Sequence, residues 1–220
     1  MRISVEATAI VASILLAFAI DAWWQDRQDR IDEQEILAGL KSEFVANLDT
    51  LTRHLAYAQR DVQTLESMVM LIENSQSNNA NSIVLETLDE MTTPATTDLG
   101  NGTLNALLSS GRIEILQSKE LRILLTAWDG VIGEVWDDQA NNAKMVLEIY
   151  IPYLIQENYS IFSIVESSGK LVDMDRLLAD ETFLTLVKLR HGFKSHLVGE
   201  FEQAISEAAH IIVEIDNSLR

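Results

Sequence analysis

The chain has 220 residues, no cysteine and a formal net charge of −18, because 34 acidic side chains outnumber 16 basic ones. Without cysteine, disulfide frameworks, zinc–thiolate sites and thiol nucleophiles are excluded for this chain. The acidic charge argues against wrapping nucleic acid, which needs clustered Lys and Arg, and against lying flat on an anionic lipid surface. Two prolines and nine glycines are few for a β-rich chain, so the composition favours long helices.

The first predicted element is a transmembrane helix from Val5 to Trp24. These 20 residues make about 30 Å of helix, which matches the hydrocarbon core of a bilayer. The run ends in Trp23 and Trp24, whose rings favour the headgroup boundary. A cleaved signal peptide is the alternative, because residues 17–19 fit a small-x-small cleavage site, but only one basic residue precedes the apolar run.

Small and acidic residues share one side of this helix. They recur at steps of three or four, as Glu6, Ala9, Ser13, Ala17 and Asp21. Small side chains let membrane helices approach closely, and an acid that faces lipid is costly. We therefore expect this stripe to pack against a transmembrane helix of another subunit or of a second copy. The alternative is that both acids reach water at the two interfaces.

A second long apolar pattern follows the anchor. Its residues recur at alternating steps of three and four over five heptads, which predicts a helix packed in a bundle. One continuous helix is expected from the membrane to about Glu73, ended by the Asn/Ser-rich turn at residues 74–82. The apolar seam reads Leu37, Leu40, Phe44, Leu48, Leu51, Leu55, Ala58, Val62, Leu65, Val69 and Ile72.

The rest of the chain predicts two short helices and two long ones. The short helices cover residues 83–91 and begin at Thr103, the second stopped by Gly111. A long helix opens at Ser118 and is kinked or ended by Pro152, and the last runs from about Asp180 to the C-terminus. Their seams read Leu121, Leu125, Trp128, Ile132, Val135, Gln139, Asn142, Val146 and Ile149, and then Val187, Phe193, Leu197, Phe201, Ile205, Ala208, Ile212, Ile215 and Leu219.

Together these elements predict an all-α fold. Residues 1–24 are the anchor, and residues 25–220 form an antiparallel helical bundle of three long helices plus short ones. Gln139 and Asn142 are polar at positions that should be buried. Such a polar layer fixes the register between packed helices, which we prefer to the alternative that it lines a small ligand pocket.

No catalytic or cofactor-binding pattern is found among the polar residues. The four histidines lack the spacing of metal ligands, and His196 and Glu200, one turn apart, are interpreted as a surface pair. Arg112, Lys119 and Arg122 form the one basic cluster, a candidate anion contact for which ordinary salt bridges are the preferred interpretation. The sequence therefore predicts no enzyme, no cofactor and no metal site.

The anchor and one later segment resemble a family of uncharacterised bacterial single-pass membrane proteins. The anchor counterpart runs from Glu6 to Trp24, and the second segment from Leu104 to Trp128. Matching positions in that segment are Leu107, Leu108, Ser110, Gly111, Ile113, Ile115, Leu116, Leu121 and Leu124. The resemblance implies a cytoplasmic N-terminus and a helical domain outside the inner membrane, whereas a plain count of basic residues places the domain in the cytoplasm.

We therefore expect an accessory or assembly subunit of the bacterial inner membrane, anchored by a single pass, with its bulk in the periplasm. Its partners would be the membrane and another transmembrane subunit or a copy of itself, without nucleic acid. A ligand-sensing extracytoplasmic helical bundle is the alternative function.

Overall fold

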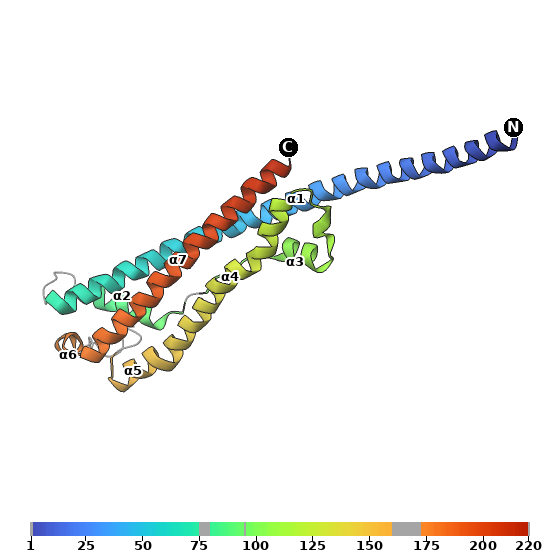
Figure 1. Ribbon diagram of the computed structural model, residues 1–220. Coiled ribbons are helices and arrows are strands. Elements are labelled where there is room, and N and C mark those ends of the chain that lie inside the picture. Colours follow the sequence, from blue (N-terminus) through green and yellow to red (C-terminus); the bar gives the residue numbers. More distant parts are fainter. Residues whose placement is uncertain (1, 75–79, 95, 160–172, 220) are drawn as a thin grey trace, which may run out of the picture. The chain divides into compact units, whose positions relative to one another are not determined.

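In the computed structural model, the backbone is described for residues 2–74, 80–94, 96–159 and 173–219, and the side chains from residue 13 onward. All regular structure in these ranges is helical, which confirms the all-α prediction (Figure 1). The elements are α1 (Arg2–Asn74), α2 (Ala80–Thr92), α3 (Gly102–Ser109), the 3-10 helix η1 (Arg112–Ile115), α4 (Lys119–Met145), the π-helix η2 (Val146–Tyr150), α5 (Ile151–Gln156), α6 (Met174–Leu178) and α7 (Glu181–Ser218).

The helices divide into two compact units. Unit 1 comprises Met1–Val45, Gly100–Thr126 and His210–Arg220, and unit 2 comprises Ala46–Leu99 and Ala127–Ala209. The three long helices α1, α4 and α7 each contribute residues to both units.

The first long helix runs without interruption from Arg2 to Asn74, as the sequence predicts. Within the part of the chain whose side chains are described, we find no helix with an apolar stretch long enough to cross a membrane. The predicted anchor begins at Val5, and its residues 5–12 lie outside that part.

In unit 1, side chains of α1 fix the segment that contains α3 and η1. The Glu43 carboxylate accepts hydrogen bonds from the backbone amides of Thr103 (2.6 Å) and Leu104 (3.2 Å), so it satisfies free donors in the first turn of α3. Glu33 accepts a bond of 2.7 Å from the Gln117 amide. The Glu43 carboxylate, which looks like a surface charge in the sequence, therefore serves as a remote helix cap.

In unit 2, α1 and α4 run in the same direction and α7 runs against both (Figure 1). Ion pairs between α1 and α7 show this order, because Lys188 contacts Glu73 at 2.8 Å and Lys194 contacts Asp61 at 2.7 Å. The bundle is therefore antiparallel between α7 and the other two helices and parallel between α1 and α4.

The buried face of α1 follows a strict heptad that includes polar residues. Of the predicted seam, Leu48 and Leu55 are only half-buried, while Asn47 takes an inward position at 3% exposure. Steps of three and four residues, taken in turn from Phe44, reach three polar residues, Asn47, His54 and Asp61. The prediction was wrong at Leu48, where it chose the nearest apolar residue over the polar residue in register. At the two later steps the polar residue and its predicted apolar neighbour are both half-buried.

A π-helix changes the register of the helix that follows α4. Gln139 and Asn142 are buried, as predicted, but Tyr150 is buried in place of the predicted Ile149, which is 41% exposed. One extra residue per turn in η2 rotates every later side chain by about 100°. Pro152 then lies in the first turn of α5, where a missing amide costs little, so the helix continues to Gln156.

The predicted helix ends at Gly111, Ser118 and Asp180 agree with the structure. Gly111 adopts φ +69°, a left-handed conformation suited to glycine, directly after the α3 cap residue. The Ser118 hydroxyl accepts a bond of 3.1 Å from the Leu121 amide at the start of α4. Asp180 Oδ1 accepts bonds from the Thr182 and Phe183 amides and caps α7.

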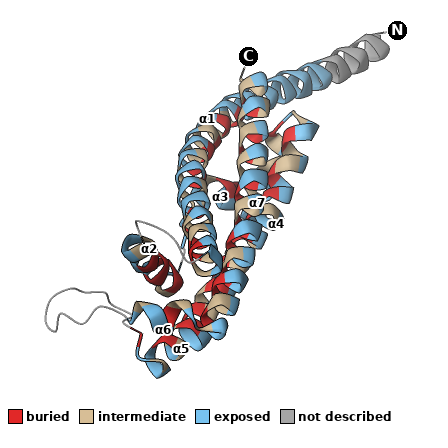
Figure 2. Ribbon diagram, turned by 90° about the vertical axis from the view of Figure 1, so that its left-hand side faces the viewer, coloured by how far each residue is buried: buried red, intermediate tan, exposed pale blue. Residues whose placement is uncertain are grey.

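The core of unit 2 lies where α2, η2, α5 and α6 meet the long helices. Burial marks the inward faces of these elements (Figure 2). Its fully or nearly fully buried members are Leu65, Met68, Leu71, Val84, Leu88, Met91, Val146, Tyr150, Leu154, Tyr159, Leu177, Phe183 and Val187.

Candidate functional site

Two cations that the predicted seam of α7 left out are buried in unit 2. Arg190 is 1% exposed and Lys194 is 2% exposed, although the predicted seam of α7 passed through Phe193, which is 39% exposed. That prediction was wrong for the same reason as on α1. Buried charges persist only where they are paired and hydrogen-bonded, so their partners define a candidate site.

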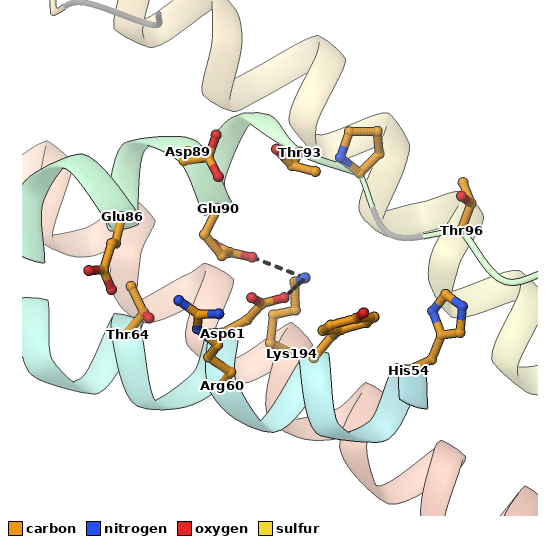
Figure 3. A pocket seen from close by; sticks show the side chains of 12 residues that line it. His54, Arg60, Asp61, Thr64, Glu86, Asp89, Glu90, Thr93, Thr96 and Lys194 are labelled. Atoms are coloured by element: carbon orange, nitrogen blue, oxygen red, sulfur yellow. Dashed lines mark hydrogen bonds and ion pairs between the residues drawn. The ribbon is translucent and has the colours of Figure 1, made fainter. Parts of the chain in front are cut away.

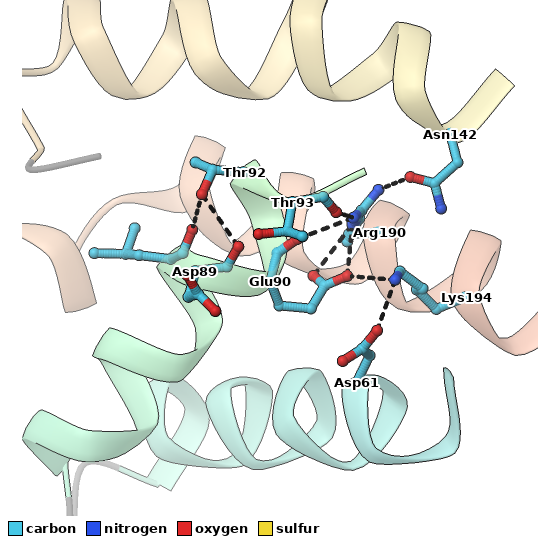
Figure 4. A network of polar contacts seen from close by, with 9 residues as sticks. Asp61, Asp89, Glu90, Thr92, Thr93, Asn142, Arg190 and Lys194 are labelled. Carbon is cyan, nitrogen blue, oxygen red and sulfur yellow. Dashed lines mark hydrogen bonds and ion pairs between the residues drawn. The ribbon is translucent and has the colours of Figure 1, made fainter. Parts of the chain in front are cut away.

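Arg190 joins the end of α2 to the bundle (Figure 4). Its Nε donates to both Glu90 carboxylate oxygens, at 2.9 and 3.1 Å. Its Nη2 donates to the carbonyl oxygens of Glu90 (2.9 Å) and Thr93 (3.1 Å), and its Nη1 donates to Asn142 Oδ1. The carbonyls of the last turn of a helix lack partners within the helix, so Arg190 both neutralises Glu90 and caps α2.

Lys194 extends this network to α1. Its Nζ lies 3.1 Å from Glu90 Oε1 and 2.7 Å from Asp61 Oδ2, which bridges two carboxylates (Figure 4). Arg190 and Lys194 are thus balanced by Glu90 and Asp61. We call these four residues the charge network.

The charge network leaves two polar atoms beside it unsatisfied. Within the described residues, Asn142 Nδ2 and the Tyr150 hydroxyl are buried without a hydrogen-bond partner. The Tyr150 ring faces the Arg190 guanidinium at 5.5 Å. Burial raises the pKa of Tyr150 to about 12, with Arg190 lowering it and Glu90 raising it further, so the hydroxyl stays protonated.

A polar pocket of about 420 Å³ opens beside the charge network (Figure 3). Side chains of α1, α2, the following loop and α7 surround it, and Lys194 and Glu90 belong to both features. The lining residues are His54, Tyr57, Arg60, Asp61, Thr64, Glu86, Asp89, Glu90, Thr93, Pro94, Thr96 and Lys194.

The free charges of this pocket are mainly negative. Across the described residues, Arg60, Glu86 and Asp89 form no ion pair, whereas the charge network neutralises its own members. Burial lowers the pKa of His54, and the nearby Arg53 lowers it further against an opposing effect of Asp98. His54 is therefore neutral near pH 7, which leaves two carboxylates against one guanidinium.

Gln139 holds the loop that forms one wall of the pocket. Its side chain accepts a bond from the Thr97 amide (3.0 Å) and donates one to the Thr97 hydroxyl (2.7 Å). Both predicted polar-layer residues thus contact groups outside the helix seam: Gln139 fixes the loop, and Asn142 accepts from Arg190. Neither belongs to the pocket lining.

The other predicted residues lie apart from this site. Glu6 and Ala9 are outside the residues with described side chains, and Ser13, Ala17 and Asp21 are exposed on α1. Of the basic cluster, Arg112 pairs with Asp32 at 2.5 Å, Arg122 donates to the Leu116 carbonyl oxygen, and Lys119 is exposed. For Arg112 this supports the interpretation as an ordinary salt bridge.

Sequence reasoning missed the charge network, although a signal for it exists. Continuing each heptad through polar residues places His54 and Asp61 on the inner face of α1 and Arg190 and Lys194 on that of α7. Opposite charges in the seams of two helices would then have predicted pairing between them.

The chain was also compared with known proteins. It matches no family model, no curated protein and no solved structure. The family resemblance described above therefore stays a prediction.

Proposed function

We propose that this protein is a membrane-anchored helical accessory subunit of the bacterial inner membrane. The N-terminal part of α1 is its single pass, and the bundle stands in the periplasm. The observation that carries this proposal is that residues 13–24 are exposed on every side of α1. They include seven large apolar side chains at 49–68% exposure: Ile14, Leu15, Leu16, Phe18, Ile20, Trp23 and Trp24.

An apolar segment as exposed as residues 13–24 would be stabilised by burial in lipid or against another protein. Burying one large apolar side chain contributes about 1.5–3 kcal/mol, so covering seven contributes roughly 10–20 kcal/mol. The densely charged run begins at Asp26, two residues after Trp24, and Asp26 and Arg30 form an exposed ion pair at 3.2 Å that suits water. A bilayer boundary at the two tryptophans fits both halves of this pattern.

The stripe of small and acidic residues supports a partner helix within the membrane. Ser13, Ala17 and Asp21 share one side of α1, and all three side chains are exposed. Close packing between membrane helices favours such residues. The accessory role follows if another transmembrane subunit, or a second copy, covers this side.

Co-purification in mild detergent tests the accessory role. Replacing Ser13 and Ala17 with Leu should release the partner while membrane insertion and bundle folding persist. The matched control replaces Ile14 and Phe18, off the stripe, with Leu, and should keep the partner. Recovery of the same partners in the same amounts with the stripe variant would refute the accessory role.

A ligand-sensing bundle is the second candidate, and the polar pocket favours it. A charge network that leaves buried polar atoms unsatisfied is an inefficient way to stabilise a core, because apolar packing does as well or better. The two unpaired carboxylates, Glu86 and Asp89, suit a small organic cation.

Thermal unfolding of the full chain in detergent tests this second function. Putrescine should raise the midpoint, succinate should not, and Asp89→Asn should abolish the effect. Glu120→Gln, an exposed acid on α4 that does not line the pocket, is the control. Equal shifts in both variants, or none with the native chain, would exclude the cation site.

A further inference from the structure

A histidine and two carboxylates meet on the surface of unit 2, outside the polar pocket. Asp138 comes from α4, and His196 and Glu200 come from α7. One ligand atom from each lies within 4.8 Å of those from the other two. His196 Nδ1 is 2.6 Å from Asp138 Oδ2, and His196 Nε2 is 3.9 Å from Glu200 Oε1.

The helices hold these three side chains in place. His196 and Glu200 are one turn apart, so they share a face of α7. Next to each group, Leu197 on α7 and Gln139 on α4 are buried. The three ligand side chains therefore project from helix positions whose neighbours in sequence are packed into the core, and not from loops.

The ligand types suit a transition metal. Zinc binds imidazole nitrogen and carboxylate oxygen at about 2.0–2.2 Å, which sets tetrahedral ligand atoms roughly 3.4 Å apart. Asp138 and Glu200 approach different nitrogens of His196, at 2.6 and 3.9 Å, and one ion binds a single nitrogen. One ligand atom from each residue lies within 4.8 Å of the other two, so side-chain rotations would have to bring these atoms to the zinc spacing. Imidazole also favours zinc-like ions over Mg²⁺ or Ca²⁺, which take oxygen ligands.

The local charge also favours a cation. Asp138 and Glu200 flank the imidazole, and Glu134, one turn before Asp138 on α4, lies close enough to act on it electrostatically. Three carboxylates around one histidine repel one another, and a divalent ion would relieve that repulsion.

We propose that Asp138, His196 and Glu200 bind one divalent transition-metal ion of the Zn²⁺ class. The ion bridges α4 and α7 and so fixes these two helices against each other within unit 2. This inference goes beyond the anchor and the pocket, and it holds or fails independently of both.

Calorimetric titration with Zn²⁺ alone tests the site, using the full chain in detergent after treatment with a chelator. One ion per chain should bind. His196→Gln and Glu200→Gln should each weaken binding roughly tenfold or more. His191→Gln is the matched control, because His191 contacts a single carboxylate, Glu66, at 3.2 Å, and it should bind as the native chain does.

Cobalt gives a second, spectroscopic readout of the same site. Co²⁺ bound to nitrogen and oxygen ligands absorbs visible light, so the native chain and His191→Gln should develop bands that His196→Gln lacks. No zinc binding by the native chain, equal binding by His196→Gln, or equal affinity for Mg²⁺ would overturn the proposal. Equal affinity for Mg²⁺ would show that the ions bind a diffuse acidic surface and not a defined site.

Discussion

Replacing Arg190 with Met tests whether the charge network holds α2 in unit 2. The variant keeps most of the apolar side-chain length but removes every donor. It leaves the Glu90 carboxylate, 5% exposed, with Lys194 as its remaining partner, and it leaves two carbonyls without a donor.

The expected cost follows from this burial. Removing one partner of a buried ion pair costs about 3–5 kcal/mol, because the other charge stays buried. Arg53→Met is the matched control, since Arg53 pairs with Asp49 on the surface at 59% side-chain exposure. Such surface pairs contribute about 0–1 kcal/mol.

Urea unfolding of the full chain in mild detergent, followed by circular dichroism, measures the two costs. Hydrogen exchange of the α2 amides supplies a local readout, because protection there should fall in Arg190→Met and not in Arg53→Met. The double variant Arg190→Met with Glu90→Leu should be more stable than Arg190→Met alone. Equal costs for Arg190→Met and Arg53→Met, with α2 protection unchanged, would refute the role of the network.

Three further predictions concern acid stability, the α1 seam and a helix end. Burial alone would raise the pKa of Asp180, but hydrogen bonds from two tyrosine hydroxyls and two amides lower it below its ordinary 3.8. The stability that these bonds contribute is therefore present above pH 3.8 and is lost as the pH falls through the lower pKa of the folded state. Asp180→Asn should flatten the acid limb of the unfolding midpoint plotted against pH, and an unchanged limb would contradict this prediction. Leu51→Ala should lower the free energy of unfolding in urea by about 2–5 kcal/mol, and Leu48→Ala, at a half-buried position, should lower it clearly less. A larger loss for Leu48→Ala than for Leu51→Ala would support the seam predicted from the sequence. Gly111→Ala should cost roughly 1–2 kcal/mol because φ is +69°. Gly130→Ala, in mid-helix where an added Cβ meets open space, should be neutral or stabilising, and thermal midpoints that move alike would contradict the strained turn.

Periodicity and turn chemistry were sufficient for the long helices and for several of their ends. The uninterrupted run to Glu73 predicted α1, and Gly111, Ser118 and Asp180 marked helix ends that the structure confirms. These signals are local, because a cap or a glycine acts on residues within one turn of itself. The π-helix at residues 146–150 has no such signal, so the register after it could not be predicted.

The candidate site could be predicted only in part. Gln139 and Asn142 were recognised because a polar residue inside an apolar seam is conspicuous. Arg190 and Lys194 were missed because each has an apolar neighbour in sequence, and single-helix patterns do not reveal a partner on another helix. Pairings over about 100 residues, such as Arg190 with Glu90, need the three-dimensional fold.

Alkaline carbonate extraction of bacterial membranes that contain the full chain tests the anchor, on which the accessory role depends. The protein should stay in the membrane pellet, and replacing Leu15 and Leu16 with Glu should move it to the supernatant, because acids in mid-membrane are costly. Replacing Ile31 and Val45, apolar and exposed beyond the anchor, with Glu should leave it in the pellet. Release of the native chain by carbonate would contradict the anchored account.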